Sequence, residues 1–185
     1  VFGTAARALV SGPNGDITVD DLPAGAYSAR IDAPDYLLKT QAFNINVGSD
    51  TQLALSVIAK PKISHVQLAA REVKITMQVV FTPNSADIAV RSTLLLSEVA
   101  DVLARNPQLR LVQVQGHTDN RGNSAQNLEL SQRRAEAVVA WLVNAGIESE
   151  RLEAKGFGDE RPLVPNLTPD NRARNRRVQF VIVPK

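Results

Sequence analysis

Two long amphipathic segments constrain the fold of this chain more than any other feature of its sequence. The first covers residues 85–105, with Ser85 as the expected N-cap, and the second covers residues 124–144, followed by Gly146 as a stop signal. The apolar positions that recur at helical spacing are Ile88, Leu95, Val99 and Val102 in the first segment, and Leu128, Ala135, Val138, Val139 and Leu142 in the second. Each helix must bury its apolar face against another layer of structure.

Strand-like segments alternate with these helices from about residue 72 onward. Strand character is found over residues 72–81, 109–115, 151–157 and 176–183, and residues 169–174 favour a short helix. In residues 72–81 the side chains of Val73, Ile75, Met77 and Val79 share one face. The order is therefore β-α-β-α-β-(α)-β. Because crossover connections are right-handed, this order predicts an α+β domain with a mixed sheet and helices on one face.

The first third of the chain has a different texture, with short strand-like stretches separated by turns. Residues 26–31 and 51–58 have strand character, and the Ser-Gly-Pro-Asn-Gly-Asp stretch at residues 11–16 is a dense turn signal. We therefore expect a small all-β, sandwich-like domain over residues 1–58. A linker over residues 59–71 would join it to the larger domain over residues 72–185.

Composition excludes several classes of function. The chain has 185 residues, no cysteine, two histidines and a formal net charge of +2. Without cysteine there is neither a disulfide framework nor a thiolate metal site, and two histidines with scattered acids form no recognisable zinc set, so we predict no metal and no cofactor. No apolar run reaches the roughly 18–20 residues of a membrane span. The chain opens at Val1 without a signal-peptide pattern, so we expect a processed protein or a fragment whose membrane anchor lies outside this stretch.

A Gly-His-Thr-Asp stretch at residues 116–119 places the Asp119 carboxylate directly after an expected strand. On the next helix, Asn127, Leu130 and Arg134 lie at positions i, i+3 and i+7, so they share one face and Arg134 can approach the loop that carries Asp119. A carboxylate and a planar guanidinium at fixed separation suit the ammonium and the carboxylate of one amino-acid head group. The alternative is an internal salt bridge between Asp119 and Arg134 that holds the loop to the helix.

Two blocks of sequence carry a resemblance to a known family. The first is Gly-His-Thr-Asp-Asn-Arg-Gly with Asn-Leu-Glu-Leu-Ser-Gln-Arg-Arg-Ala, within residues 116–135, and the second is Gly-Phe-Gly, Pro162 and Asn-Arg-Ala-Arg-Asn-Arg-Arg-Val, within residues 156–178. Together they closely resemble the OmpA-like C-terminal domain of the OmpA, Pal and MotB type, over roughly residues 72–183. The resemblance implies noncovalent binding of peptidoglycan through the diaminopimelate of its stem peptide.

The same resemblance implies the residues that hold the ligand. Asp119 would grip the ammonium of diaminopimelate, and Arg134, fifteen positions later, would grip its carboxylate. Supporting contacts are implied for the side chains of Asn84 and Arg176, and main-chain contacts near Thr118 and Asn127. Arg177 follows on the expected strand and would point to the opposite face.

The resemblance also implies where such a protein works. It indicates the periplasm of a Gram-negative bacterium, in association with the outer membrane, with peptidoglycan as partner and either a homodimer or other envelope proteins as further partners. In the first third of the chain, the stretches at residues 22–27 and 33–37 resemble the hairpin of carboxypeptidase-regulatory-like or PEGA-type β-modules. That resemblance implies a structural spacer or a protein-contact module.

Other classes of function have less support in the sequence. The pair of His117 and Asp119 lacks a placed nucleophile, so we predict that the protein is not an enzyme and that His117 orders the loop by hydrogen bonding. Basic residues near the C-terminal end could contact phosphates, but aromatic residues for stacking on bases make up only 4% of the chain, so no nucleic-acid partner is predicted. The main alternative is an envelope module that keeps the fold for protein interaction without binding the wall.

Overall fold

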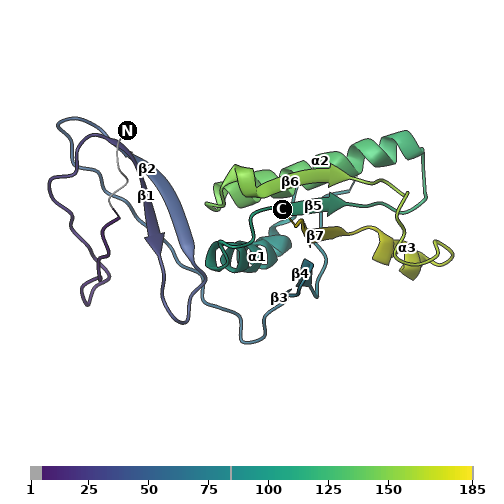
Figure 1. Ribbon diagram of the computed structural model, residues 1–185, viewed down its shortest axis with the longest axis horizontal. Helices are drawn as coiled ribbons and strands as arrows, with labels where there is room; N and C mark the ends of the chain where they lie inside the picture. Colours follow the sequence, from purple (N-terminus) through teal and green to yellow (C-terminus); the bar gives the residue numbers. More distant parts are fainter. Residues whose placement is uncertain (1–5, 84, 185) are drawn as a thin grey trace.

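The computed structural model describes residues 6–83 and 85–184, and it contains two sheets and three α-helices (Figure 1). A two-stranded sheet near the N-terminus pairs β1 (Gly25–Ile31) with β2 (Lys39–Ile45). The larger sheet has five strands: β3 (Val66–Leu68), β4 (Glu72–Ile75), β5 (Val112–Gly116), β6 (Leu152–Gly156) and β7 (Val178–Ile182). The helices are α1 (Thr93–Arg105), α2 (Ser124–Asn144) and α3 (Pro169–Asn175), with 3-10 turns η1 (Val90–Ser92) and η2 (Ser149–Arg151).

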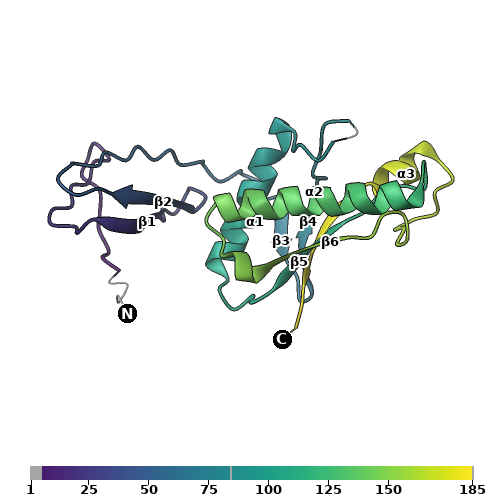
Figure 2. The same cartoon turned by 90° about the horizontal axis from the view of Figure 1, so that it is seen from above.

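The five strands lie in the order β3-β4-β7-β5-β6. Only the β5–β6 pair is parallel, while β7 runs antiparallel to both of its neighbours, β4 and β5. Helices α1 and α2 lie on the same side of this sheet (Figures 1 and 2). The prediction of an α+β fold, with a mixed sheet covered by helices and a separate β unit near the N-terminus, is confirmed.

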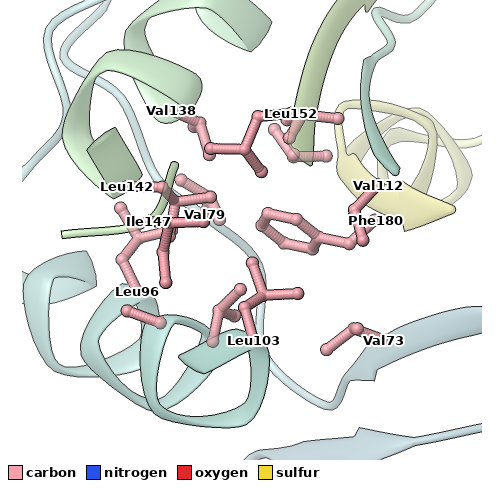
Figure 3. Close-up of a cluster of buried hydrophobic side chains, with 14 of the residues drawn as sticks. Val73, Val79, Leu96, Leu103, Val112, Val138, Leu142, Ile147, Leu152 and Phe180 are labelled. Atoms are coloured by element: carbon pink, nitrogen blue, oxygen red, sulfur yellow. The ribbon is translucent and has the colours of Figure 1, made fainter. Parts of the chain in front are cut away.

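An aliphatic core fills the space between the helices and the sheet (Figure 3). Phe180 of β7 is 1% exposed and lies at the centre, between side chains of α1, α2 and β5. Of the apolar helix positions that the sequence predicted, the buried ones are Leu95, Val99, Ala135, Val138 and Leu142. Leu96 and Leu103 of α1, which were not predicted, are buried as well. Gly116 lets α2 approach β5 closely, because a Cβ atom there would collide with the backbone of Ser131.

The second helix begins and ends where the sequence predicted, whereas the first begins later. Residues 85–89 are not helical, because Ala89 donates to the carbonyl of Val80 and Phe81 forms a β-bridge with Ile88. Pairing with the preceding extended segment thus replaces the first predicted turns of the helix, and Ser85 is not the N-cap. Its hydroxyl bonds to Asp87 instead.

Two further expectations differ from the structure. Strand β4 ends at Ile75, so Met77 is exposed rather than part of the predicted apolar face. Leu128, near the start of α2, is also exposed, whereas its neighbour Asn127 is buried. Among the described residues, no helix combines the length and the hydrophobicity that crossing a bilayer requires.

The N-terminal unit is a two-stranded sheet and not a sandwich. The strand predicted at residues 26–31 is present as β1, but residues 51–58 form no strand because they pair with the chain at few points, such as the bond from the Leu37 amide to the Ile58 carbonyl. The larger sheet begins at Val66, inside the stretch that we expected to be a linker. The identity of this N-terminal unit as a PEGA-like module stays a prediction.

Candidate functional site

The topology of the sheet brings three loops to one edge. Strands β5 and β6 are parallel, so their C-terminal ends meet there, and β7 begins at the same edge because it runs in the opposite direction. Asp119 follows β5, Phe157 follows β6, and Arg176 precedes β7. Main-chain bonds join these loops, from the Thr118 amide to the Gly158 carbonyl at 2.8 Å and from the His117 amide to the Arg177 carbonyl at 3.0 Å.

The carboxylate of Asp119 is almost completely buried and is held by two groups. Its Oδ2 atom lies 2.6 Å from Nη1 of Arg176, and its Oδ1 atom accepts from the backbone N–H of Arg121 at 3.0 Å. The sequence left open an internal salt bridge between Asp119 and Arg134, but in the structure the cation that pairs with Asp119 is Arg176. The side chain of Arg176 is 49% exposed, so the pair opens towards solvent on one side only.

Arg134 lies on α2 at the same edge, without an acidic partner within salt-bridge distance among the described residues. Its Nε–H donates to the carbonyl of Ser85 at 3.0 Å, and its guanidinium lies 4.9 Å from the centre of the Phe81 ring. Burial lowers the pKa of Arg134, and the neighbouring positive charges of Arg176 and Arg133 lower it further. A partly desolvated guanidinium without a counter-charge gains from pairing with an anion, and its planar fork suits a carboxylate.

The other predicted site residues have different positions. The side chain of Asn127 is buried and donates to the carbonyls of Asp119 and Arg121, at 3.3 and 3.1 Å, so it fixes the loop that carries the carboxylate. The main-chain N–H groups of Thr118 and Asn127 donate to carbonyl oxygens within the fold, and the main-chain ligand contacts that the resemblance implies near these residues stay a prediction. Asn84 lies outside the described residues.

His117 does not order the loop by hydrogen bonding through its side chain, contrary to our prediction. The ring is 3% exposed, and neither ring nitrogen has a hydrogen-bond partner among the described residues. It stacks on Phe157 with the ring centres 5.3 Å apart, and Arg161 lies on Phe157 at 3.9 Å. Burial lowers the pKa of His117 to about 4, and the charges of Arg177 and Arg161 contribute, so the ring is neutral at pH 7.

Two buried polar residues support the site and were missed by the sequence analysis. Asn175, at the end of α3, is fully buried and uses its amide in four hydrogen bonds with the loop of residues 163–166, next to Arg176. Ser131 on α2 accepts from the Gly158 amide at 2.8 Å and so ties the loop after β6 to the helix. Only the Asn-Arg-Ala-Arg-Asn-Arg-Arg pattern marks Asn175 in the sequence. Ser131 lies at helical spacing between Leu128 and Ala135, which predicts a buried position but not a role beside the site.

Two hollows lie near this edge. The smaller, of about 20 Å³, lies between Phe81, His117, Arg134 and Arg176, and it holds no more than one water molecule. The larger, of about 310 Å³, is lined by Leu128, Phe157, Asp159 and their neighbours, and by none of the predicted site residues. We therefore place the candidate site at the charged side chains of Asp119, Arg134 and Arg176, which the fold brings to this edge. No group of three or more His, Asp or Glu among the described residues could hold a metal ion.

Comparison with known proteins identifies the family to which the chain belongs. The model of the OmpA family matches residues 80–176, more than half of the chain. The chain belongs to the OmpA family. Domains of this family are not enzymes, which confirms that prediction.

Individual members of the OmpA family show how far the similarity extends. The peptidoglycan-binding protein ArfA of Mycobacterium tuberculosis is 40% identical over 88 residues, which are 48% of this chain and 27% of ArfA. The chain also covers less than two thirds of the length of several other curated relatives.

Two solved structures are similar to this chain in both sequence and fold. The peptidoglycan-associated lipoprotein of Burkholderia pseudomallei is 36% identical with a TM-score of 0.52, covering 56% of this chain and 87% of that one. The cell wall anchor of the type VI secretion system (T6SS) of Pseudomonas aeruginosa is 30% identical with a TM-score of 0.54, covering 65% and 87%.

Proposed function

We propose that the OmpA-like domain of this chain binds peptidoglycan noncovalently and so anchors an envelope protein or complex to the cell wall. The observation that carries the proposal is the half-buried Arg134 without an acidic partner, at the same sheet edge as the buried Asp119 carboxylate. The names of the relatives support it, since ArfA is described as peptidoglycan-binding, the Burkholderia protein as peptidoglycan-associated and the Pseudomonas protein as a cell wall anchor.

The ligand that fits these charges is the free end of diaminopimelate, which carries an ammonium and a carboxylate on one carbon. Asp119 takes the ammonium, and the guanidinium of Arg134 takes the carboxylate. In the free protein the carboxylate of Asp119 is paired with Arg176. Because the side chain of Arg176 is half exposed, it can turn towards solvent while the ligand ammonium takes its place and keeps the buried carboxylate paired. Arg176 then makes the supporting contact with the ligand, while Asn127 and Thr118 keep the loop in place.

The proposed location is the cell envelope, in the compartment that contains peptidoglycan. The relatives come from mycobacteria as well as from Gram-negative genera, so the similarity does not restrict the source to Gram-negative bacteria.

The test is retention of the purified 185-residue chain on insoluble peptidoglycan sacculi, with free meso-diaminopimelate as competitor. Asp119→Asn keeps the acceptor for the Arg121 amide but removes the charge, and Arg134→Gln removes the guanidinium. Each variant leaves one charge of the ligand unpaired. The expected loss of about 2–5 kcal/mol corresponds to at least about a 30-fold weaker affinity.

A matched control is available on the same helix. Arg133→Gln removes an equal charge one residue away, where the side chain is 56% exposed and pairs only loosely with Glu129. This variant is expected to be retained like wild type. Folded wild-type protein that is not retained, or Asp119→Asn that is retained equally, would refute the proposal and favour a protein-interaction module.

A further inference from the structure

Two acidic side chains of α1 are almost completely buried, Glu98 at 3% and Asp101 at 8% exposure. A buried carboxylate is costly unless partners satisfy it. Glu98 accepts from the Ser64 hydroxyl at 3.0 Å, from the His65 amide at 2.8 Å, and lies 3.1 Å from the His65 ring. These partners belong to the segment before the five-stranded sheet and outside the region that matches the OmpA family.

The second acid reaches further towards the N-terminus. Asp101 accepts from the backbone amide of Leu38, which immediately precedes β2, at 2.8 Å. The same oxygen accepts from Nε of Arg105 at 2.8 Å, and the far end of that guanidinium donates to Asp32 at 2.9 Å. Arg105 therefore links an acid of the OmpA-like domain to an acid at the end of β1.

A steric contact lies beside this polar one. Gly146, in the turn after α2, has a φ of +96°, and a Cβ atom there would lie 2.6 Å from the Cβ of Thr40 on β2. The hairpin thus contacts the ends of both long helices. A two-stranded sheet alone is marginally stable in water, so this contact supplies support that the hairpin lacks by itself.

The contact lies at the pole of the domain opposite to the candidate site (Figures 1 and 2). It involves the C-terminal ends of α1 and α2, whereas Asp119 and α3 lie near the N-terminal end of α2. Helix α2 has 21 residues, so roughly 30 Å separates its two ends.

We propose that the β1–β2 hairpin is docked on the OmpA-like domain as a fixed arm, through the cluster of Asp32, Leu38, Asp101 and Arg105 and the contact of Thr40 with Gly146. The two units move as one rigid body in solution. Under the proposed function, on which only this last point rests, the arm holds the preceding part of the protein at a fixed direction, away from the wall.

The test is nuclear magnetic resonance (15N) relaxation of the whole chain, comparing backbone amides of β1 and β2 with those of α1 and α2. In wild type, both sets are expected to report one rotational correlation time. Thr40→Trp places a large side chain against Gly146, and Asp101→Leu removes the acceptor of the Leu38 amide. In either variant the hairpin amides are expected to tumble with a correlation time lower by roughly half, because a small tethered unit moves faster than the whole chain.

Thr40→Trp keeps the test decisive if Asp101→Leu does not fold, since Thr40 lies outside the OmpA-like domain. Separate correlation times in wild type, or unchanged tumbling of Thr40→Trp, would overturn the inference. Retention on sacculi is measured in parallel. Thr40→Trp is expected to bind like wild type, so that failure of the docking and failure of wall binding give different results.

Discussion

His117 makes the stability of this domain depend on pH in a defined window. Its ring is buried without a hydrogen-bond partner, and burial lowers its pKa from the ordinary 6.5 to about 4. Above pH 6.5 the ring is neutral in the folded and unfolded chains and has no effect. Between pH 6.5 and 4 the unfolded chain binds a proton that the folded chain does not, so the free energy of unfolding falls as the pH falls. Below about pH 4 both states are protonated and the loss levels off.

The two pKa values give the size of this effect. At about 1.4 kcal/mol for each pH unit between them, the full loss is about 3 kcal/mol, of which about 2 kcal/mol is reached by pH 5. This is a large part of the ordinary stability of a domain, which is about 5–15 kcal/mol.

The assay is urea unfolding of wild type and His117→Phe at pH 7 and pH 5. Phenylalanine keeps the stack on Phe157 and removes the titrating group, so its loss of stability between the two pH values is expected to be about 2 kcal/mol smaller than that of wild type. His65→Gln is the control, because His65 is the only other histidine and that variant retains the His117 effect. The reasoning is refuted if wild type and His117→Phe lose equal stability, or if the His117 ring resonance titrates near pH 6.5.

Two substitutions test polar groups that hold the fold and the site. Arg151→Met removes a guanidinium that donates to the carbonyls of Leu103, Asn106 and Leu109, at and just after the end of α1. We expect the free energy of unfolding, measured with urea, to fall by about 2–3 kcal/mol. A fall below about 0.5 kcal/mol would contradict this account. Asn175→Ala removes four hydrogen bonds to the loop of residues 163–166 at a fully buried position. We expect the free energy of unfolding to fall by about 3 kcal/mol and retention on sacculi to weaken. If neither quantity changes, the loop does not depend on Asn175.

The parts of the fold that the sequence predicted well are those in which local pattern and tertiary packing agree. Helix α2 has the predicted bounds because its apolar face and its packing surface coincide over most of its length. The predicted start of α1 was wrong because residues 85–89 turn back and pair with residues 80–82, and such β-type pairing leaves no trace in helical periodicity. Strand β3 was not predicted for a different reason, because its three residues are too few to show a period-2 pattern.

The candidate site shows a similar division. Asp119 could be placed at the sheet edge from the sequence, because a loop after a strand is where functional groups gather on such scaffolds. The identity of its ion-pair partner could not, since Arg134 and Arg176 are both arginines at that edge and only the packed loops select Arg176, 57 positions away. The unpaired state of Arg134 follows from that selection, and the proposed contact with an anion rests on it.

This unpaired cation predicts selectivity between two forms of the wall. When the carboxylate at the free end of diaminopimelate is amidated, the ligand keeps its ammonium for Asp119 but offers Arg134 only a neutral carboxamide. Hydrogen bonds to a charged group are worth about twice those between neutral groups, and the half-buried guanidinium would keep its charge uncompensated. The expected difference of about 1–2 kcal/mol is about a 10-fold weaker affinity for amidated sacculi. Arg134→Gln is expected to bind both forms of sacculi weakly and equally, because glutamine does not distinguish carboxylate from carboxamide by charge. Equal retention of wild type on both forms would show that Arg134 does not contact this carboxylate.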